Sequence, residues 1–193
     1  MEKLIIFIDG YNLYKSLNRL KRKKIIENDN IDFIKLGEVL SDSTLLPTKD
    51  EKLQLIRIYY YDCPKYQFSN PTPEQREIYQ KKQKALEILK SLPLMKVRLG
   101  HLVRRNGNFI EKGVDIKIAS DMLSLAFNNA YDIAILISGD ADFEEVIDQI
   151  QRLGKQVFNA GFKGYGDSEA LKKICDGFID LIPTLDKIVI KTS

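Results

Sequence analysis

The sequence has little cysteine and almost no histidine. Of its 193 residues, only Cys63 and Cys175 are cysteines, and they lie far apart in the chain without a CxxC pair. Two cysteines are too few for a disulfide framework, so we expect both to be reduced and structural. His101 is the only histidine, which disfavours a zinc site.

Long hydrophobic runs are also missing. The apolar run from Leu4 to Ile8 covers only five residues and ends at an aspartate, so it predicts neither a signal peptide nor a membrane span. We therefore expect a cytoplasmic protein with no membrane partner. Hydrophobic residues make up 44% and charged residues 30% of the chain, which is typical of a folded globular protein. The length fits one domain, residues 1–193.

The chain has no strong excess of one charge. A net charge of +3 and a pI near 8.7 permit a nucleic-acid partner without indicating one. Basic residues crowd the stretch from Arg19 to Lys24 and recur at Arg104 and Arg105. A solvated charged face is the commoner explanation for each such cluster.

Apolar runs alternate with helical patterns along most of the chain. We expect strands at residues 3–8, 54–60, 95–99, 131–138 and 155–160. We expect helices beyond residue 12, at 72–92, 113–127 and 143–153, and near 168–175. Asn106-Gly107 lies between two apolar-polar runs and predicts an antiparallel hairpin there. This order of elements predicts an α/β fold with a mainly parallel sheet and right-handed crossovers.

Aspartates directly follow the two most apolar strands. Asp9 follows the first strand, and Asp140 and Asp142 follow the strand at 131–138. Asp115 opens the helix that leads into the latter strand. Ligands of open parallel sheets bind beyond the carboxyl ends of the strands, so these acids converge if the two strands are neighbours.

Carboxylates gathered in one place need a positive partner. They repel one another, and burying them unpaired is costly. Oxygen ligands without nearby Cys or His suit a hard cation, Mg²⁺ or Mn²⁺, rather than zinc or copper. One or two such ions could activate water and stabilise the leaving oxygen of a phosphodiester. This pattern predicts a nuclease.

A structural role is the alternative for the same residues. Asp is a favoured helix N-cap, which is the simpler explanation for Asp142 alone and is plausible for Asp9. Asp121 and Glu144 occupy helical positions where a solvated surface is more common than a ligand. The position of Asp9 and Asp140 at the ends of two apolar strands is harder to explain by capping.

Three motifs occur in order: FIDGYNLY at Phe7–Tyr14, KGVDIKIASDML at Lys112–Leu123 and SGDADF at Ser138–Phe143. Together they resemble the NYN domains of the PIN-like nuclease superfamily, in the branch of small stand-alone bacterial proteins. The resemblance spans residues 4–162 and leaves 163–193 as a C-terminal helix and tail. It implies a three-layer PIN-like fold with strand order 3-2-1-4-5, a metal-dependent ribonuclease site, and RNA as the substrate.

The resemblance also implies a role for each matching residue. The implied catalytic acids are Asp9, Asp115, Asp140 and Asp142, of which the first three would hold Mg²⁺ or Mn²⁺. The implied supporting residues are Asn12, Ser138 and Asp121. Water would attack the phosphorus and leave a 5′-phosphate.

Basic residues near these motifs are candidates for phosphate contacts. Lys112 precedes the acid-bearing helix, although a surface lysine is about as good an explanation. Arg104 and Arg105 in the hairpin form a candidate RNA-gripping arm. Such contacts give affinity without sequence preference.

Several alternatives stay open or are disfavoured. A PIN-like domain with little or no activity could act as an RNA-binding or protein-binding regulatory module. A phosphatase with an Asp nucleophile is disfavoured, because Tyr11 occupies the place of its second Asp. Gly161, Gly164 and Gly166 have the wrong spacing for a dinucleotide site. The apolar tail 179–190 either packs on the domain or pairs with another copy, and we lean toward a homodimer.

Overall fold

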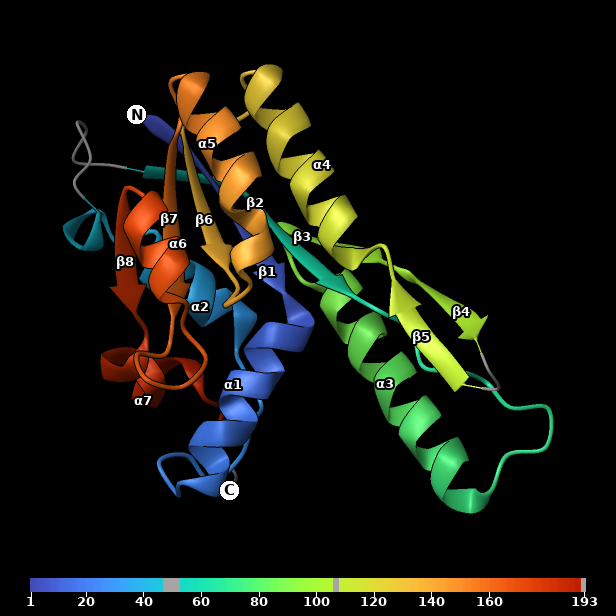
Figure 1. Ribbon diagram of the computed structural model, residues 1–193. Coiled ribbons are helices and arrows are strands. Elements are labelled where there is room, and N and C mark those ends of the chain that lie inside the picture. Colours follow the sequence, from blue (N-terminus) through green and yellow to red (C-terminus); the bar gives the residue numbers. More distant parts are fainter. Residues whose placement is uncertain (47–52, 106–107, 192–193) are drawn as a thin grey trace.

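The computed structural model describes residues 1–46, 53–105 and 108–191. Its centre is a six-stranded sheet in the order β3-β2-β1-β6-β7-β8, and every pair of neighbours is parallel (Figure 1). The strands are β1 (Glu2–Asp9), β2 (Leu53–Asp62), β3 (Met95–Leu99), β6 (Ile133–Ile137), β7 (Gln156–Gly161) and β8 (Gly177–Asp180). The expected α/β fold with a parallel sheet is confirmed.

Helices cover both faces of this sheet. The apolar residues of one face pack with α1 (Gly10–Arg22), α2 (Phe33–Leu40), α3 (Pro73–Ser91) and α7 (Leu185–Ile188). Those of the other face pack with α4 (Val114–Phe127), α5 (Glu144–Arg152) and α6 (Glu169–Ile174). Three short 3₁₀ turns are η1 (Ser43–Leu45), η2 (Ala141–Phe143) and η3 (Ile182–Thr184). The result is a three-layer structure.

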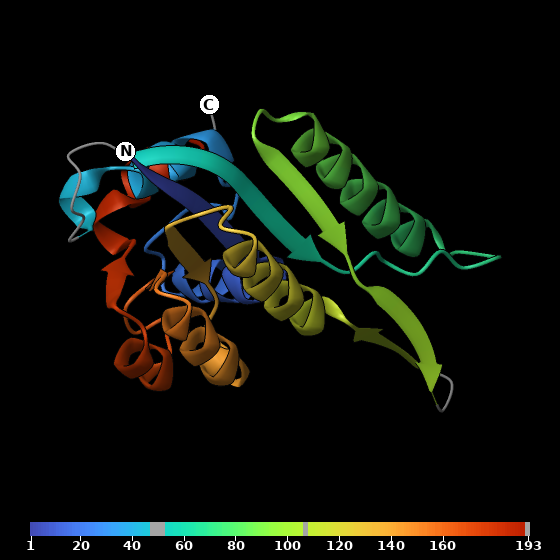
Figure 2. The ribbon, with the colours of Figure 1, turned by 90° about the horizontal axis from the view of Figure 1, so that it is seen from above.

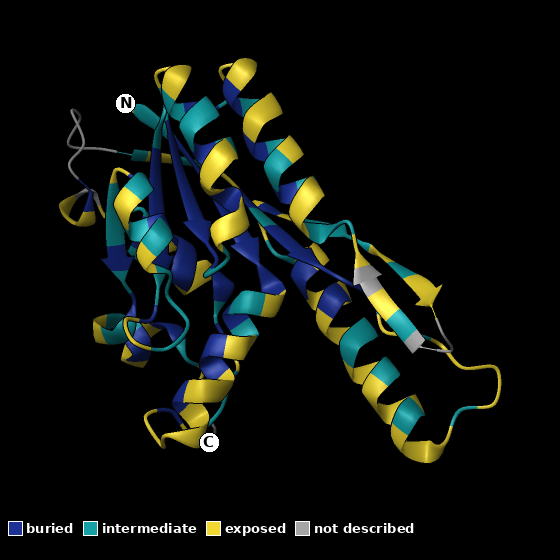
Figure 3. Ribbon diagram, in the orientation of Figure 1, coloured by how far each residue is buried: buried dark blue, intermediate teal, exposed yellow. Residues whose placement is uncertain are grey.

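Strand β1 explains why the core has two halves. Ile6 and Ile8 point to one face, Ile5 and Phe7 point to the other, and all four are buried. A strand that lies between β2 and β6 under two helical layers has no solvent side, so its sequence is continuously apolar. The inner strands β1, β6 and β7 are accordingly the most deeply buried elements (Figure 3).

The helix starts follow local capping rules. Thr72 caps α3 through the backbone N–H of Gln75, whose side chain accepts the Thr72 N–H in return, and Pro73 stands in the first turn. Asp32 caps α2 with hydrogen bonds from two backbone N–H groups. Helix α2 itself was not expected from the sequence.

One part of the chain extends away from the rest. Strands β4 (His101–Arg105) and β5 (Asn108–Lys112) form a separate antiparallel ribbon, which confirms the expected hairpin. Its expected turn, Asn106-Gly107, lies outside the described residues. The ribbon projects from the sheet together with one end of α3 (Figures 1 and 2). We call residues 64–112 the arm; besides this projection, it includes the edge strand β3 and the end of α3 that packs in the core. The rest of the chain is the body.

The expected strand order 3-2-1-4-5 is wrong. The sheet has a sixth strand, β8, which pairs with β7 through Phe158↔Gly177 to Gly161↔Asp180. The hairpin supplies two more strands outside the sheet, so the chain order becomes 3-2-1-6-7-8. Strand β8 was missed because it has only four residues, starts with glycine, and lacks a long apolar run.

The C-terminal tail packs on its own domain. The side chains of Leu181, Leu185 and Ile188 are buried in the core. The Asp32 N–H donates to the Ile188 carbonyl at 2.8 Å, so the tail is hydrogen-bonded to the start of α2. Of the two arrangements that the sequence left open, the structure has the intramolecular one, and a homodimer stays a prediction. Among the described residues, no helix combines the length and apolarity needed to cross a bilayer.

Candidate active site

Asp9 lies at the carboxyl end of the central strand and is only 2% exposed. Its Oδ1 accepts the backbone N–H of Asn12 at 3.1 Å, which caps α1. Its Oδ2 accepts the Asn12 side-chain amide at 2.5 Å and the Ser138 hydroxyl at 3.0 Å. The strand and the helix therefore hold this carboxylate in one fixed orientation.

The turn after Asp9 has room only for glycine. A Cβ on Gly10 would lie 2.5 Å from the Tyr60 hydroxyl oxygen and 2.8 Å from the Tyr61 carbonyl oxygen. Strand β2 is the neighbour of β1 here, with Asp9 paired to Tyr61. Close packing against β2 thus requires glycine at position 10, independently of any chemistry.

The loop after β6 adds Ser138 and Asp140 to this edge of the sheet. Ile137 pairs with Ile8, so Ser138 follows directly opposite Asp9. The Ser138 hydroxyl oxygen donates to Asp9 and accepts the Asp140 N–H at 3.2 Å. Asp140 in turn accepts the Asp142 N–H at 3.1 Å, which starts η2. One serine hydroxyl links the two acid-bearing loops.

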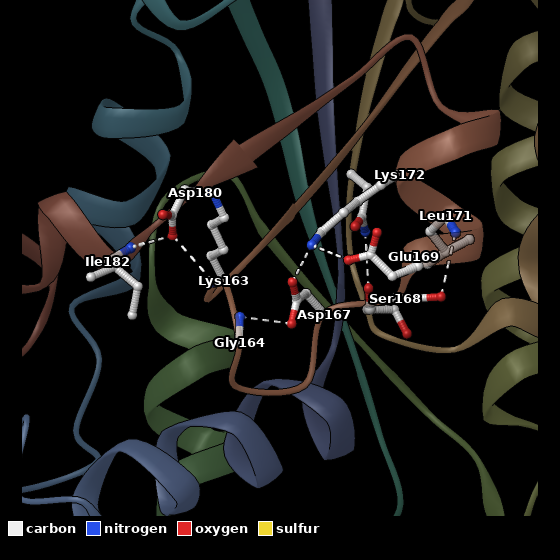
Figure 4. A network of polar contacts seen from close by, with 11 residues as sticks. Lys163, Gly164, Asp167, Ser168, Glu169, Leu171, Lys172, Asp180 and Ile182 are labelled. Carbon is white, nitrogen blue, oxygen red and sulfur yellow. Dashed lines mark hydrogen bonds and ion pairs between the residues drawn. The ribbon is translucent and has the colours of Figure 1, made fainter.

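The loop after β7 packs against the loop that carries Ser138 and Asp140. A Cβ on Gly139 would lie 1.9 Å from the Gly166 carbonyl oxygen, so only glycine fits between the two loops. The second loop is held in place by Asp167, which accepts the Gly164 N–H at 2.9 Å and forms an ion pair with Lys172 (Figure 4). The loop that carries Asp140 therefore packs against a loop whose own conformation is fixed by hydrogen bonds and an ion pair.

Asp115 reaches the same place from the first turn of α4. Partial burial raises its pKa above the ordinary value, and the charges of Asp9, Asp140 and Asp142 raise it further. The pKa of Asp9 is also raised, mainly by burial and in part by the charge of Asp140, while hydrogen bonds from Asn12 and Ser138 oppose the rise. Four carboxylates therefore share one electrostatic environment, as the sequence pattern suggested.

An open cleft of about 560 Å³ lies over these groups. Its carboxylates are Asp9, Asp62, Asp115 and Asp140, and its lysines are Lys15 and Lys112. Tyr11, Asn12, Cys63, Gly113, Val114, Ile116 and Gly139 complete the lining. The cleft is therefore lined by both carboxylates and lysines. Carboxylates can bind a metal ion, and the lysines can attract an anionic ligand to it.

The remaining sequence-derived candidates lie in different places. Asp142 is exposed in η2 and is not part of the cleft lining. Asp121 accepts hydrogen bonds from Arg98 at 3.0 Å and from the Tyr61 hydroxyl at 2.9 Å, so it fixes α4 against the sheet. Lys112 lines the cleft, whereas Arg104 and Arg105 are exposed nearer the hairpin turn.

The NYN domain family matches residues 3–185 of this chain, which is nearly its whole length. The chain belongs to the NYN domain family. The suspected family is thereby confirmed, and it is part of the PIN-like nuclease superfamily.

A solved structure of unknown function shares this fold. VPA0982, a protein of unknown function from Vibrio parahaemolyticus RIMD 2210633, superposes with a TM-score of 0.60 at 22% identity over 93% of each chain. The nicotinamidase SaPncA from Staphylococcus aureus gives a TM-score of only 0.34 at 11% identity over 90% of this chain and 88% of its own. No curated protein matches the sequence.

Sequence reasoning missed an acid of the NYN cleft, Asp62. It ends β2 as Asp9 ends β1, is 7% exposed, and lines the cleft. It accepts the Tyr60 hydroxyl at 2.8 Å and the Cys63 N–H at 2.7 Å, and it forms an ion pair with Lys82 of α3. The strand was expected to stop at Tyr60. Extending it by two residues would have placed Asp62 at the same sheet edge.

Asn159 is a second residue that sequence reasoning missed. It is fully buried in β7, and its side-chain amide donates to the carbonyls of Leu136 at 3.0 Å and Ser138 at 2.9 Å. It therefore fixes the backbone from which Ser138 and Asp140 project. The signal was present, because Asn159 is the one amide in the otherwise apolar stretch VFNA.

The donor set suits a hard cation, but it is not gathered into a finished site. Within residues 1–46, 53–105 and 108–191, no group of three or more His, Cys, Asp or Glu side chains is arranged to hold a metal ion. The cleft nevertheless contains carboxylates. Partial burial raises the pKa of Asp115, and the charges of Asp9, Asp140 and Asp142 raise it further; a bound cation would offset this negative field. NYN and PIN-like nucleases usually use divalent metals.

Proposed function

We propose that this NYN domain is a metal-dependent ribonuclease that hydrolyses RNA phosphodiesters in the cleft. The observation that carries the proposal is the convergence of Asp9, Asp115 and Asp140, from three separate elements, on one open cleft. NYN nucleases act on RNA, and the cleft places lysines beside its acids. Because the chain has only two cysteines, which lie far apart in the sequence, we also propose a reducing compartment, the cytoplasm.

Asp9, Asp115 and Asp140 are the residues that would hold Mg²⁺ or Mn²⁺. When bound, a divalent cation of this kind supplies Lewis-acid polarisation of a phosphate oxygen and lowers the pKa of water. These three residues offer carboxylate oxygens, which are the ligands that these ions prefer over nitrogen or sulfur.

Other residues of the cleft position these acids. Asn12 and Ser138 both donate to Asp9 Oδ2, which favours the ionised form of the carboxylate and fixes its rotamer. Asn159 and Ser138 fix the loop that carries Asp140. Partners of this type are what orient ligand side chains in metal sites.

The two cleft lysines would contact the scissile strand. Lys112 ends β5 and Lys15 lies on the exposed face of α1, and both line the cleft together with the acids. An ammonium group offsets phosphate charge without selecting a base. Asp142 would add negative charge at the rim rather than line the cleft.

The test is cleavage of end-labelled single-stranded and structured RNAs in Mg²⁺, Mn²⁺ or EDTA. The wild type is compared with Asp9→Asn and Asp140→Asn, and with Asp186→Asn, which makes the same chemical change at an exposed position outside the cleft. We expect cutting that requires the metal, is lost in both cleft variants and survives in the control. Metal-independent cutting, or equal cutting by all four proteins, would contradict the proposal.

A second candidate function is an RNA-binding or protein-binding module with little catalysis. It is favoured by one specific observation, namely that the described acids form no ready-made metal group. In the same experiment, this function predicts RNA retention on a filter with no cutting above the level of Asp140→Asn.

A further inference from the structure

The arm carries a cluster of aromatic side chains that the proposed chemistry does not use. Tyr66 stacks on Phe109 with ring centroids 3.5 Å apart and an interplanar angle of 19°. Phe68 stands edge-on to Tyr66 at 4.8 Å, and its side chain is 40% exposed. The cluster joins the loop after β2 to strand β5 of the hairpin. Its rings therefore lie at the surface of a projecting segment, outside both cores.

These rings form the walls of a pocket. The pocket has a volume of about 250 Å³ and is also lined by Tyr79 of α3 and Leu102 of β4. Pockets for drug-sized ligands are larger, about 300–1,000 Å³. A pocket of this size with flat aromatic walls suits one planar ring system.

The charge of the segment that carries the pocket indicates the class of ligand. Residues 64–112 hold eleven Lys and Arg against four Glu, a formal charge of +7. The rest of the chain holds nineteen Lys and Arg against 23 Asp and Glu, a formal charge of −4. Arg104 is paired with Phe109 across the hairpin, so its side chain leaves the same face of the ribbon as the aromatic cluster. A flat apolar pocket in a basic segment is complementary to a base on a phosphate backbone.

The pocket adjoins the cleft along the chain. Cys63 lines the cleft and the next residue, Pro64, lines the pocket. On β5, Lys112 lies in the cleft and Phe109 lies in the pocket. Three residues of a strand span about 10 Å, so neighbouring nucleotides of one strand can reach both places. In a duplex the bases are stacked inside the helix and cannot enter such a pocket.

We propose that the aromatic pocket formed by Tyr66, Phe68, Tyr79 and Phe109 binds an unpaired nucleobase of the RNA strand whose phosphodiester lies in the cleft. The inference rests on the proposed function for the occupant of the cleft, but the pocket itself is tested by binding alone. It makes single-stranded RNA the preferred substrate class. Base stacking on the exposed Phe68 ring supplies affinity without sequence preference.

The experiment measures binding in EDTA, where the proposed cleavage is off. Single-stranded oligoribonucleotides carry 2-aminopurine at successive positions, and a matched duplex serves as the second ligand. The variants are Phe68→Ala and Phe68→Tyr, which keeps an aromatic ring. Phe127→Ala is the matched control, because Phe127 is a 77% exposed phenylalanine at the end of α4 in the body. Circular dichroism checks that each variant is folded.

We expect Phe68→Ala to weaken binding of the single strand about tenfold, with little change for the duplex. Phe68→Tyr and Phe127→Ala should bind as the wild type does. The 2-aminopurine emission should be quenched at one or two positions by the wild type and not by Phe68→Ala. Unchanged affinity and unchanged quenching in Phe68→Ala would overturn the inference and leave the pocket to a protein partner or to internal packing.

Failure of this inference is distinguishable from failure of the proposed function. If Asp140→Asn abolishes cutting while Phe68→Ala binds RNA normally, the nuclease stands and the base pocket falls. If Phe68→Ala loses single-strand affinity while no protein cuts RNA, the base pocket stands and the nuclease falls.

Discussion

The body and the arm of this NYN domain are built on different physical principles. In the body, the acids are placed by buried strands whose ends must meet at one edge of the sheet, and Asp9 is held by three hydrogen bonds. The arm consists of an exposed loop, α3, the edge strand β3 and a hairpin (Figures 2 and 3). Its basic residues and its aromatic cluster lie on these elements. The formal charge is −4 in the body and +7 in the arm.

This difference indicates that the body serves the chemistry and the arm serves RNA binding. A rigid, buried frame can keep like charges close together, because the fold covers the electrostatic cost, and such a frame suits chemistry. An exposed basic segment costs little to build and suits attraction of a polyanion. If this division is real, substitutions in the body should affect cutting and substitutions in the arm should affect binding.

The largest expected effect is the loss of cutting in the body variants. Asp9→Asn or Asp140→Asn should lower kcat/KM for RNA by more than about a hundredfold, since loss of an outer-shell partner alone costs 10–100-fold in metal sites. RNA affinity in EDTA should stay close to that of the wild type. Parallel cleavage and anisotropy measurements check this. A variant that loses binding as much as cutting would break the division.

Ser138→Ala should have the next largest effect. It removes the hydroxyl that donates to Asp9 and accepts from the Asp140 N–H, so cutting or metal affinity should fall about 10–100-fold. Ser124→Ala, on the exposed side of α4, is the matched control. The measurement is the Mg²⁺ dependence of cleavage, and an unchanged metal dependence would show that this hydroxyl does not organise the site.

The third largest effect is expected at the ion pair between Lys82 of α3, in the arm, and Asp62 at the end of β2, in the body. Lys82→Met leaves the buried Asp62 without its ion-pair partner, which should cost about 1–3 kcal/mol of unfolding free energy. Urea unfolding measures the loss. The double variant Asp62→Asn with Lys82→Met should recover most of it, because the uncompensated charge is removed. A double variant as unstable as the single one would mean that packing of the lysine stem, not charge, holds α3.

Arm cations should have a smaller effect, and on binding alone. Replacing Arg104 and Arg105 by Gln should weaken RNA binding several-fold. If each arginine contacts one phosphate of a single strand, the slope of log K against log salt concentration should become less steep by about 1.4. Lys163→Gln with Lys187→Gln makes the same charge change on the body. Equal effects of both pairs would mean that net charge, rather than the arm, attracts RNA.

The smallest expected effect is a gain of stability. The pKa of Asp115 is raised in the folded protein, first by burial and then by the charges of Asp9, Asp140 and Asp142. The folded state thus binds the proton more tightly than the unfolded state, so stability falls as pH rises from the ordinary value of 3.8 through the folded value.

Asp115→Asn should therefore melt slightly higher than the wild type at pH 7 in EDTA, and this advantage should vanish at pH values below about 3.8. Added Mg²⁺ should reverse the order, because it stabilises only the protein that binds it well. Thermal melts at the two pH values, with and without Mg²⁺, check both signs. A wild type that is unaffected by Mg²⁺ would argue against a cation site.

Much of the fold could be predicted from local patterns. The apolar runs gave β1 and β6, and the Thr72-Pro73 cap marked the start of α3, because these signals depend on neighbouring residues alone. Strand β8 and helix α2 were missed because they are short and gain their stability from the sheet and the tail that they contact. Asp62 was missed because β2 is two residues longer than its apolar pattern suggested.

The sequence by itself determined the family, the α/β class and three of the acids that line the cleft, Asp9, Asp115 and Asp140, since motif spacing and the ends of apolar runs are local features of the sequence. Only the tertiary structure decided which strands are neighbours. It therefore decided that Asp62 lines the cleft with Asp9, whereas Asp121 accepts a hydrogen bond from Arg98. It also decided that the hairpin and one end of α3 project from the sheet and that residues of this segment line an aromatic pocket. The physical reason is that carboxylate convergence and pocket formation depend on contacts between residues distant in sequence, which no local pattern encodes.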